Sequence, residues 1–278
     1  MISFDFEYYK PDTLDEAVEA YSRLNLSELK PVYYAGGTDI ISLARCNQME
    51  FKAVIDIKDI PECRILKAEN NQIKIGAAVS LTQICEFNPL PLLTAVLKMV
   101  ADHTSRNRIT FGGNVCSLLP YKEAVLPLLI CNADVVIMGP EGCRTTPINQ
   151  IFKKKMVHDK GEFLVQFIIA DEYGDLPYRY IKKTKSGQLD YPLISVAALK
   201  KDNQDRFAFS GIYPYPFRSA FIEEDLNNAD LTVDNKIDLA LSHMRAQKVD
   251  DILGSAEYRE FLISNALRDI MFSLEEVQ

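Results

Sequence analysis

The sequence predicts an α+β protein built from two domains. Short apolar strands alternate with helical segments in the first part of the chain, and the composition changes at the acidic stretch 171–175. After this stretch, three strand-like runs precede three helical runs, which is a typical order for an α+β domain. We therefore expect a first domain over residues 1–172, with subdomains of about 1–58 and 59–172, and a smaller domain over residues 173–278.

The first elements predict a small unit of strands and helices. Residues 2–9 are expected to form a strand. Thr13 and Glu16 have the spacing of a capping box, and apolar residues then recur at helical intervals. Short apolar strands are expected over 31–35 and 53–57, with a short helix or turn between them.

The next elements predict a sheet with helical connections. Two alternating runs, 65–68 and 72–76, flank a turn and predict a hairpin. Ser80 and Gln83 form a second candidate capping box. The remaining expected elements are helices over 91–100 and 124–131, strands over 135–138 and 163–170, and then, in the smaller domain, strands over 178–183, 193–200 and 207–213 followed by helices over 217–227, 235–247 and 257–274.

Composition indicates a protein without a metal or nucleic-acid partner of its own. The 278 residues carry a net charge of −8, which disfavours nucleic acid and anionic membranes. The N-terminus lacks the features of a signal peptide, and no apolar run reaches the ~20 residues that span a bilayer. We therefore expect a soluble, cytoplasmic protein. Its cysteines form no Cys-x-x-Cys pair, which disfavours a zinc or iron–sulfur site: Cys46, Cys63, Cys85, Cys116, Cys131 and Cys143.

Two glycine pairs are the strongest candidates for a binding site. Gly36-Gly37 follows an apolar strand, and Gly112-Gly113 lies further along the chain. Glycine permits positive φ angles and close approach of a ligand, and successive N–H groups in such a turn can bind an anion. A helix that begins after Asp39 would add its positive N-terminal end. Two such loops predict a long, phosphate-bearing ligand, although each pair alone could also be an ordinary turn.

The amino-acid sequences of these two loops resemble those of a known family. Ala35-Gly36-Gly37-Thr38-Asp39, followed by the stretch from Arg106 to Asn114, is similar to the FAD-binding subunit of molybdenum hydroxylases. That family includes xanthine dehydrogenases and carbon monoxide dehydrogenases. The resemblance implies a FAD-binding domain of the vanillyl-alcohol-oxidase (PCMH) type, followed by a carbon monoxide dehydrogenase flavoprotein C-terminal-like domain with a three-stranded sheet and a helical bundle.

The same resemblance implies the partners and the cofactor. FAD would accept electrons from [2Fe-2S] clusters on a small subunit and pass them to NAD+ or another acceptor. Substrate would be hydroxylated at molybdopterin on a large subunit, with xanthine-like purine oxidation preferred. This chain would then need no acid/base residue of its own, and no catalytic residue is expected in it.

By resemblance, the cofactor-binding residues lie in both glycine segments and in the second half of the chain. Leu164 would pack on the cofactor. Glu123 stands near the position of a family aspartate, and Lys182 and Asp190 near residues beside the flavin ring. A solvated carboxylate at Glu123 and a solvated charge run at Lys182 are the alternatives. The implied residues of the two glycine segments are Val32, Tyr33, Tyr34, Ala35, Gly36, Gly37, Thr38, Asp39, Thr110, Phe111, Gly112, Gly113 and Asn114.

Other functions remain open. A stand-alone flavin oxidoreductase of the same superfold would need substrate-binding residues for which the small second domain leaves little room. A scaffold that has lost redox function is the third hypothesis. A Rossmann dehydrogenase is disfavoured, because no Gly-x-Gly-x-x-Gly follows the first strand. The histidines predict no catalytic constellation, but His103 could approach the cofactor from seven residues before Thr110.

Overall fold

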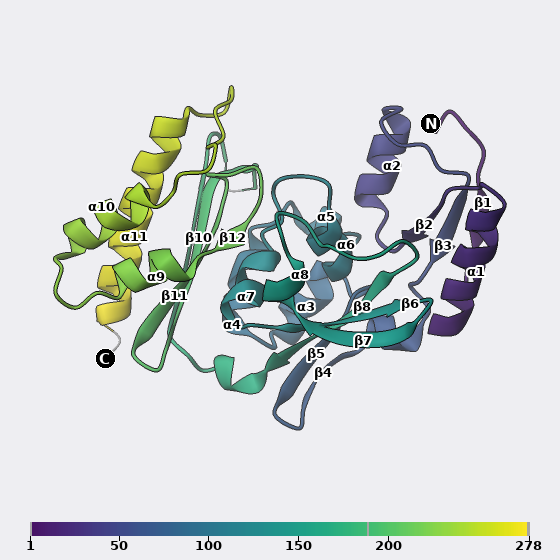
Figure 1. The fold of residues 1–278 in the computed structure, drawn as a ribbon, viewed down its shortest axis with the longest axis horizontal. Helices are drawn as coiled ribbons and strands as arrows, with labels where there is room; N and C mark the ends of the chain where they lie inside the picture. Colours follow the sequence, from purple (N-terminus) through teal and green to yellow (C-terminus); the bar gives the residue numbers. More distant parts are fainter. Residues whose placement is uncertain (1, 188, 277–278) are drawn as a thin grey trace. The chain divides into compact units, whose positions relative to one another are not determined.

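The structure, a computed structural model, describes residues 2–187 and 189–276 (Figure 1). The chain forms two compact units. Unit 1 consists of the segment that ends at Pro89 together with His103–Leu118 and Ala133–Asp171, and unit 2 consists of Leu90–Asp102, Leu119–Asn132 and the segment that begins at Glu172. These units describe packing, so the domain limits 1–172 and 173–278 stay a prediction.

The first sheet of unit 1 has three parallel strands in the order β1-β3-β2. Its central strand, β3, is fully buried, because Ile55 packs on the side of α1 while Val54 packs on the opposite side against Phe51. Tyr34 and Asp56 are register partners where β2 and β3 end. In open parallel sheets, ligands bind beyond the carboxyl ends of the strands. The elements of this part are β1 (Glu7–Tyr9), α1 (Leu14–Leu26), β2 (Pro31–Tyr34), α2 (Thr38–Arg45) and β3 (Ala53–Asp56).

The second sheet of unit 1 has five antiparallel strands in the order β4-β5-β8-β6-β7. The predicted hairpin is confirmed, with Leu66 opposite Ile75. We did not predict β7, whose polar, largely exposed residues give no apolar pattern. Its strands are β4 (Leu66–Glu69), β5 (Gln72–Gly76), β6 (Asp134–Gly139), β7 (Gly142–Pro147) and β8 (Phe163–Ala170), and its connections contain η1 (Pro61–Arg64), α3 (Leu81–Phe87), α5 (His103–Arg106), α6 (Phe111–Cys116) and α8 (Ile148–Ile151).

Side-chain caps fix where two helices of unit 1 begin. The capping box at α3 is confirmed, since Ser80 and Gln83 each bond to the other's backbone N–H. Thr13 also caps α1 by accepting from the Glu16 N–H at 3.2 Å. The Glu16 carboxylate, however, accepts from the Asp12 N–H at 2.9 Å, one residue earlier than a capping box requires.

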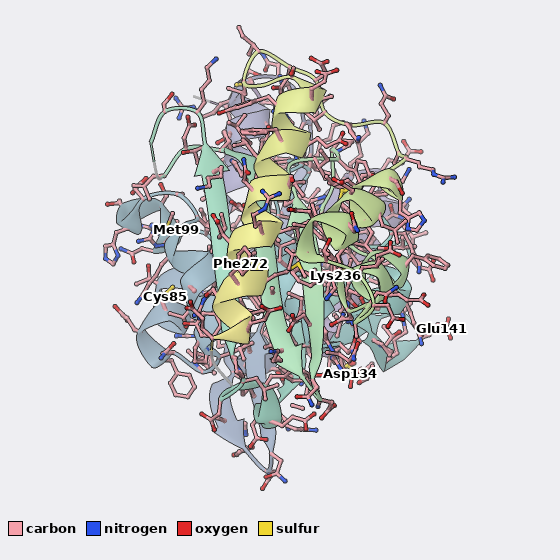
Figure 2. All side chains as sticks on the ribbon, turned by 90° about the vertical axis from the view of Figure 1, so that its left-hand side faces the viewer. Cys85, Met99, Asp134, Glu141, Lys236 and Phe272 are labelled. Carbon is pink, nitrogen blue, oxygen red and sulfur yellow. The ribbon has the colours of Figure 1, made fainter. Side chains whose placement is uncertain are left out.

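Unit 2 is a four-stranded antiparallel sheet, in the order β12-β11-β10-β9, with helices packed against it. Ile194 and Val196 of β10 pack in one core with Leu267 of α11, while α4 and α7 also contact β10, whose alternate residues are buried as well. Figure 2 shows α11 lying across the sheet with Phe272 on its exposed side. The elements are α4 (Pro91–Lys98), α7 (Val125–Ile130), η2 (Asp171–Tyr173, which begins at the last residue of unit 1), β9 (Tyr178–Thr184), β10 (Pro192–Lys201), β11 (Gln204–Ser210), β12 (Phe217–Arg218), α9 (Ala220–Leu226), α10 (Val233–Ser242) and α11 (Ala256–Glu275).

Three predicted elements differ from the structure. The first strand begins at Glu7 rather than at residue 2. The helix predicted over 217–227 begins at Ala220, because Phe217–Arg218 pairs with β11 as a fourth strand of a sheet for which we expected three. The second glycine pair is not a loop, since it lies in the first turn of α6.

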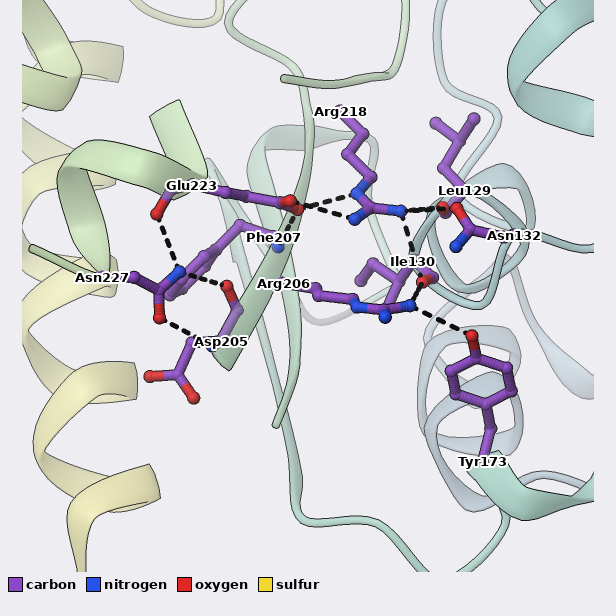
Figure 3. A network of polar contacts seen from close by, with 10 residues as sticks. All are labelled: Leu129, Ile130, Asn132, Tyr173, Asp205, Arg206, Phe207, Arg218, Glu223 and Asn227. Carbon is purple, nitrogen blue, oxygen red and sulfur yellow. Dashed lines mark hydrogen bonds and ion pairs between the residues drawn. The ribbon is translucent and has the colours of Figure 1, made fainter. Parts of the chain in front are cut away.

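Two arginines hold the end of α7 in unit 2 (Figure 3). Arg218 donates to the carbonyl of Leu129 at 2.9 Å and forms a two-pronged ion pair with Glu223. Arg206 donates to the carbonyl of Ile130 at 3.2 Å. The last carbonyls of a helix have no partner within it and favour cationic donors. These contacts give Arg218 a structural role within unit 2.

Candidate functional site

A cavity of about 630 Å³ lies within unit 1, and most of the predicted cofactor-binding residues line it. Its volume is within the range of about 300–1,000 Å³ that is usual for small-molecule sites. Three segments meet there: the end of β2 with the start of α2, the start of α6, and the residues that lead into β8. The predicted residues that line it are Val32, Tyr33, Tyr34, Ala35, Gly36, Gly37, Thr38, Asp39, Thr110, Gly112, Gly113 and Leu164.

The first glycine pair is required by its surroundings at both positions. A Cβ atom on Gly36 would lie 2.1 Å from the backbone oxygen of Arg108. Gly37 has a φ of +72°, and a Cβ there would lie 2.4 Å from the hydroxyl oxygen of Tyr34. Positive φ angles of this kind are strained for other residues. The pair therefore lets two distant segments touch and lets the chain turn into α2.

The start of α2 presents positive polarity to the cavity. Gly37 is the N-cap, and the first N–H groups of a helix have no acceptor within it. These groups and the helix dipole favour a negatively charged ligand. Asp39, in the first turn, accepts a hydrogen bond of 2.5 Å from Ser117 just beyond α6. This bond links the two segments that carry the glycine pairs.

The second glycine pair differs from the expected anion-binding loop. In the first turn of α6, the N–H of Phe111 donates to Val79 and the N–H of Gly112 donates to Ala77, each at 2.9 Å. A Cβ on Gly112 would lie 2.6 Å from that of Ala77. Two of the N–H groups that we expected to converge on a ligand therefore anchor α6 to the end of β5. Gly113 lines the cavity, and a Cβ on it would lie 2.7 Å from the Thr110 hydroxyl oxygen.

Thr110 supplies a polar group without a partner. Thr110 is among the lining residues and is 4% exposed, and its buried Oγ1 has no hydrogen-bond partner among residues 2–187 and 189–276. A buried hydroxyl without a partner carries a desolvation cost of about 1–3 kcal/mol. The site therefore fits a ligand that hydrogen-bonds here. Phe111 and Asn114 are absent from the lining, and Phe111 packs in the core against Phe167.

Aromatic residues form another wall of the cavity. Tyr33 stacks on Tyr21 with ring centroids 5.1 Å apart, and its ring lies 4.5 Å from that of Phe163. Its hydroxyl donates to the carbonyl of Gly161 at 2.8 Å, and burial raises the pKa of Tyr33. His158 lies nearby in the lining. We did not predict Tyr21 or the 158–163 segment, because nothing local in the sequence links them to the glycine pairs.

The remaining predicted residues lie in unit 2, outside this cavity. The Lys182 and Glu123 side chains are 2% and 4% exposed and form an ion pair at 3.1 Å. Lys182 also donates to the carbonyl of Met99 at 2.7 Å. Burial raises the pKa of Glu123, and the neighbouring Lys182 partly offsets this effect. The alternative that these residues are solvated is therefore wrong.

Two other predicted residues are absent from the cavity lining. Asp190 accepts from the N–H of the next residue, Tyr191, at 2.8 Å. His103 lies on α5, is exposed, and is not part of the cavity lining. Across the described part of the chain, no group of three or more His, Cys, Asp or Glu side chains could hold a metal ion. No described helix is long and apolar enough to cross a bilayer.

Known proteins resemble this chain over most of its length. Residues 4–170 match the family described as FAD binding domain in molybdopterin dehydrogenase. The chain is 30% identical over 249 residues to the xanthine dehydrogenase FAD-binding subunit of Escherichia coli O157:H7, covering 83% of this chain and 82% of that protein. It is 27% identical over 273 residues to the carbon monoxide dehydrogenase medium chain of Hydrogenophaga pseudoflava, covering 93% of each. Its fold is similar to that of a solved carbon monoxide dehydrogenase from the same organism, with a TM-score of 0.88, 24% identity and 99% coverage of both chains.

Proposed function

Because the chain belongs to the FAD-binding subunits of the molybdenum hydroxylase family, we propose that it transfers electrons from [2Fe-2S] clusters of a small partner through FAD to NAD+ or another acceptor. Substrate hydroxylation would take place at molybdopterin on a large partner. The observation that carries this proposal is the cavity at which Gly36-Gly37, the start of α2 and the Thr110 hydroxyl meet, a hydroxyl that has no partner among the described residues.

In this proposal, unit 1 holds the FAD and fixes its charged part. The N–H groups at the start of α2 and the Thr110 hydroxyl would bind the diphosphate and its neighbouring hydroxyls. The apolar wall formed by Tyr33, Phe163 and Leu164 would exclude water from the cofactor. FAD, when bound, supplies a redox centre that exchanges electrons with both one-electron and two-electron partners. We also propose that the FAD-binding part is of the vanillyl-alcohol-oxidase type.

Unit 2 contributes the residues that resemble those beside the flavin ring in this family. Lys182 and Asp190 remain proposals for this role, and Glu123 remains a proposal for a residue that bonds cofactor hydroxyls. A cation near the ring stabilises the reduced, anionic flavin. The ion pair with Glu123 reduces the net field of Lys182, so we propose a smaller effect on the flavin potential than that of an unpaired lysine.

We propose xanthine-like purine oxidation for the assembled complex. The support is the 30% identity to a xanthine dehydrogenase subunit. This identity is only slightly higher than the 27% identity to a carbon monoxide dehydrogenase subunit. The substrate pocket would lie on the large partner, and the residues that select the substrate would lie there as well.

The first experiment is to purify the full chain, record its visible absorption and identify any released cofactor by mass spectrometry. We expect a flavin spectrum and FAD in the released fraction. A colourless protein that also takes up no added FAD would contradict the proposal and favour the scaffold hypothesis.

A second experiment tests the partners and the acceptor. The tagged chain is isolated from its native cells, and the co-purifying chains are analysed for molybdenum and iron. We expect both metals, NADH formation when the chemically reduced complex is mixed with NAD+, and turnover of xanthine. Turnover by the flavin-loaded chain alone would instead support the stand-alone oxidoreductase.

A further inference from the structure

A buried carboxylate lies at the end of β3, next to the first glycine pair in unit 1. Asp56 is 2% exposed. Its Oδ2 accepts hydrogen bonds of 2.5 Å from the Tyr8 hydroxyl and from the Lys58 ammonium group, and its Oδ1 accepts from the Lys58 N–H at 2.9 Å. Buried charges are stable only when they are paired and hydrogen-bonded. Asp56 therefore fixes both the backbone and the side chain of Lys58.

Lys58 in turn contacts the residues that precede the glycine pair. Its Nζ donates to the carbonyl of Ala35 at 3.2 Å and lies 4.4 Å from the ring centroid of Tyr34. Ala35 directly precedes Gly36, and the Tyr34 hydroxyl occupies the space where a Cβ of Gly37 would lie. One ammonium group thus connects the end of β3 to both residues that lead into the glycine turn.

We propose that Asp56 and Lys58 are positioning residues for FAD binding. Asp56 orients Lys58, and the Lys58 ammonium group holds the Ala35 carbonyl so that Gly36, Gly37 and the start of α2 face the diphosphate. This inference rests on the proposed function. It adds to that function two residues that do not themselves line the cavity.

The contacts favour this role over simple support of the sheet. β1, β2 and β3 are already joined by parallel pairing, which ends at Tyr34 and Asp56. The Lys58 ammonium group lies beyond this last pair and bonds to the turn itself. The Tyr8 hydroxyl is a second donor on the same carboxylate oxygen, and this hydrogen bond raises the pKa of Tyr8 to about 12. Asp56 thus accepts from three donors, and these bonds fix its position relative to the turn.

The test compares FAD binding to the full-length wild type, Lys58→Met and Lys58→Arg after removal of bound FAD. Binding and release are followed by flavin fluorescence. Lys67→Met is the matched control, because Lys67 also pairs with a carboxylate in unit 1 but lies on the exposed β4–β5 hairpin. We expect Lys58→Met to release FAD at least tenfold faster with an association rate within twofold of wild type. Lys58→Arg should recover most of this loss, and Lys67→Met should bind as wild type does.

The release rate separates positioning from loss of folding. A variant that had only lost stability would show fewer binding sites with the wild-type release rate, and that result overturns the proposal. If Lys58→Met does not fold, Asp56→Asn is tested by the same release-rate criterion. Its single amide oxygen can still accept from the Lys58 N–H, whereas the charge that orients the ammonium group is removed. If the wild type itself binds no FAD, the proposed function fails as well. If the wild type binds and neither variant releases FAD faster, the positioning role alone fails.

Discussion

Gly36 lies against the backbone carbonyl of Arg108, with no room for a Cβ atom between them. A Cβ added to Gly36 would be 2.1 Å from that oxygen, and a backbone atom cannot move aside as a flexible side chain can. Sequence reasoning attributed this glycine to the approach of a ligand. The structure shows that it is needed first for contact between two segments of the chain.

Gly36→Ala is therefore expected to destabilise unit 1 and weaken FAD binding together. The added methyl group would push the two segments apart, as in an overpacked core, and such overpacking lowers the free energy of unfolding by about 1–3 kcal/mol. Urea unfolding and FAD titration of the full chain measure both effects. Gly187→Ala is the control, because a Cβ there would have no atom of the described residues within 4 Å, apart from its chain neighbours. Wild-type stability and affinity in Gly36→Ala would contradict the packing argument.

Thr110→Val is expected to weaken FAD binding without loss of stability. The valine keeps the shape but removes a hydroxyl that has no partner among the described residues, so the folded protein without ligand loses no hydrogen bond. A net hydrogen bond contributes about 1 kcal/mol, which corresponds to a roughly fivefold change in affinity. Thr82→Val is the matched control, since Thr82 is likewise buried without a partner in unit 1 but lies outside the cavity. Equal FAD affinities of the two variants would show that the Thr110 hydroxyl does not bind FAD.

Lys182→Met is expected to destabilise the protein in a pH-dependent way. Without its cation, the buried Glu123 carboxylate is unpaired, and breaking such pairs costs about 3–5 kcal/mol. Burial raises the pKa of Glu123, and removal of Lys182 raises it further. When folding raises the pKa of a carboxyl group, the free energy of unfolding falls as pH rises above the group's ordinary pKa of 4.5. The loss of stability in Lys182→Met relative to wild type should therefore be largest near pH 7 and vanish below about pH 4.5.

The matched variants for this experiment are chosen from the same unit. Glu123→Gln combined with Lys182→Met removes both charges and should abolish the pH dependence. Lys185→Met, which removes an exposed lysine that donates to the Ile252 carbonyl, should change little. Unfolding in urea at several pH values measures these differences. A loss of stability in Lys182→Met that does not change with pH would contradict the proposed dependence on the charge of Glu123.

Thiol labelling is expected to report occupancy of the cavity. Cys46, Cys116 and Cys143 are exposed, and Cys116 lines the cavity. Burial raises the pKa of Cys63 and Cys131 to about 12, so at pH 8 almost none of either is the reactive thiolate. We expect the exposed thiols to react quickly and FAD to slow only Cys116, as measured by mass spectrometry of the labelled peptides. The same Cys116 rate with and without FAD would place the ligand elsewhere.

Local patterns in the sequence were sufficient to predict most strands and helices. The Leu66–Glu69 and Gln72–Gly76 hairpin follows from period-2 alternation around a turn, and the start of α3 follows from the Ser80 and Gln83 capping box. Each of these depends on residues that are close in the sequence. The second glycine pair was expected in a loop because Gly-Gly is a common turn signal, whereas hydrogen bonds to Val79 and Ala77 hold it in α6.

By itself, the sequence predicted most of the strands and helices, two glycine pairs as candidate binding residues, and the family that the chain resembles. Only the tertiary structure decided that Gly36 must accommodate Arg108, that Tyr33 and Phe163 form one wall, and that Lys182 pairs with Glu123. The physical reason is that propensity, capping and periodicity act between near neighbours, while these contacts depend on how sheets and helices pack. Close packing permits few arrangements of side chains, and it leaves no local trace in the sequence from which a distant partner could be identified.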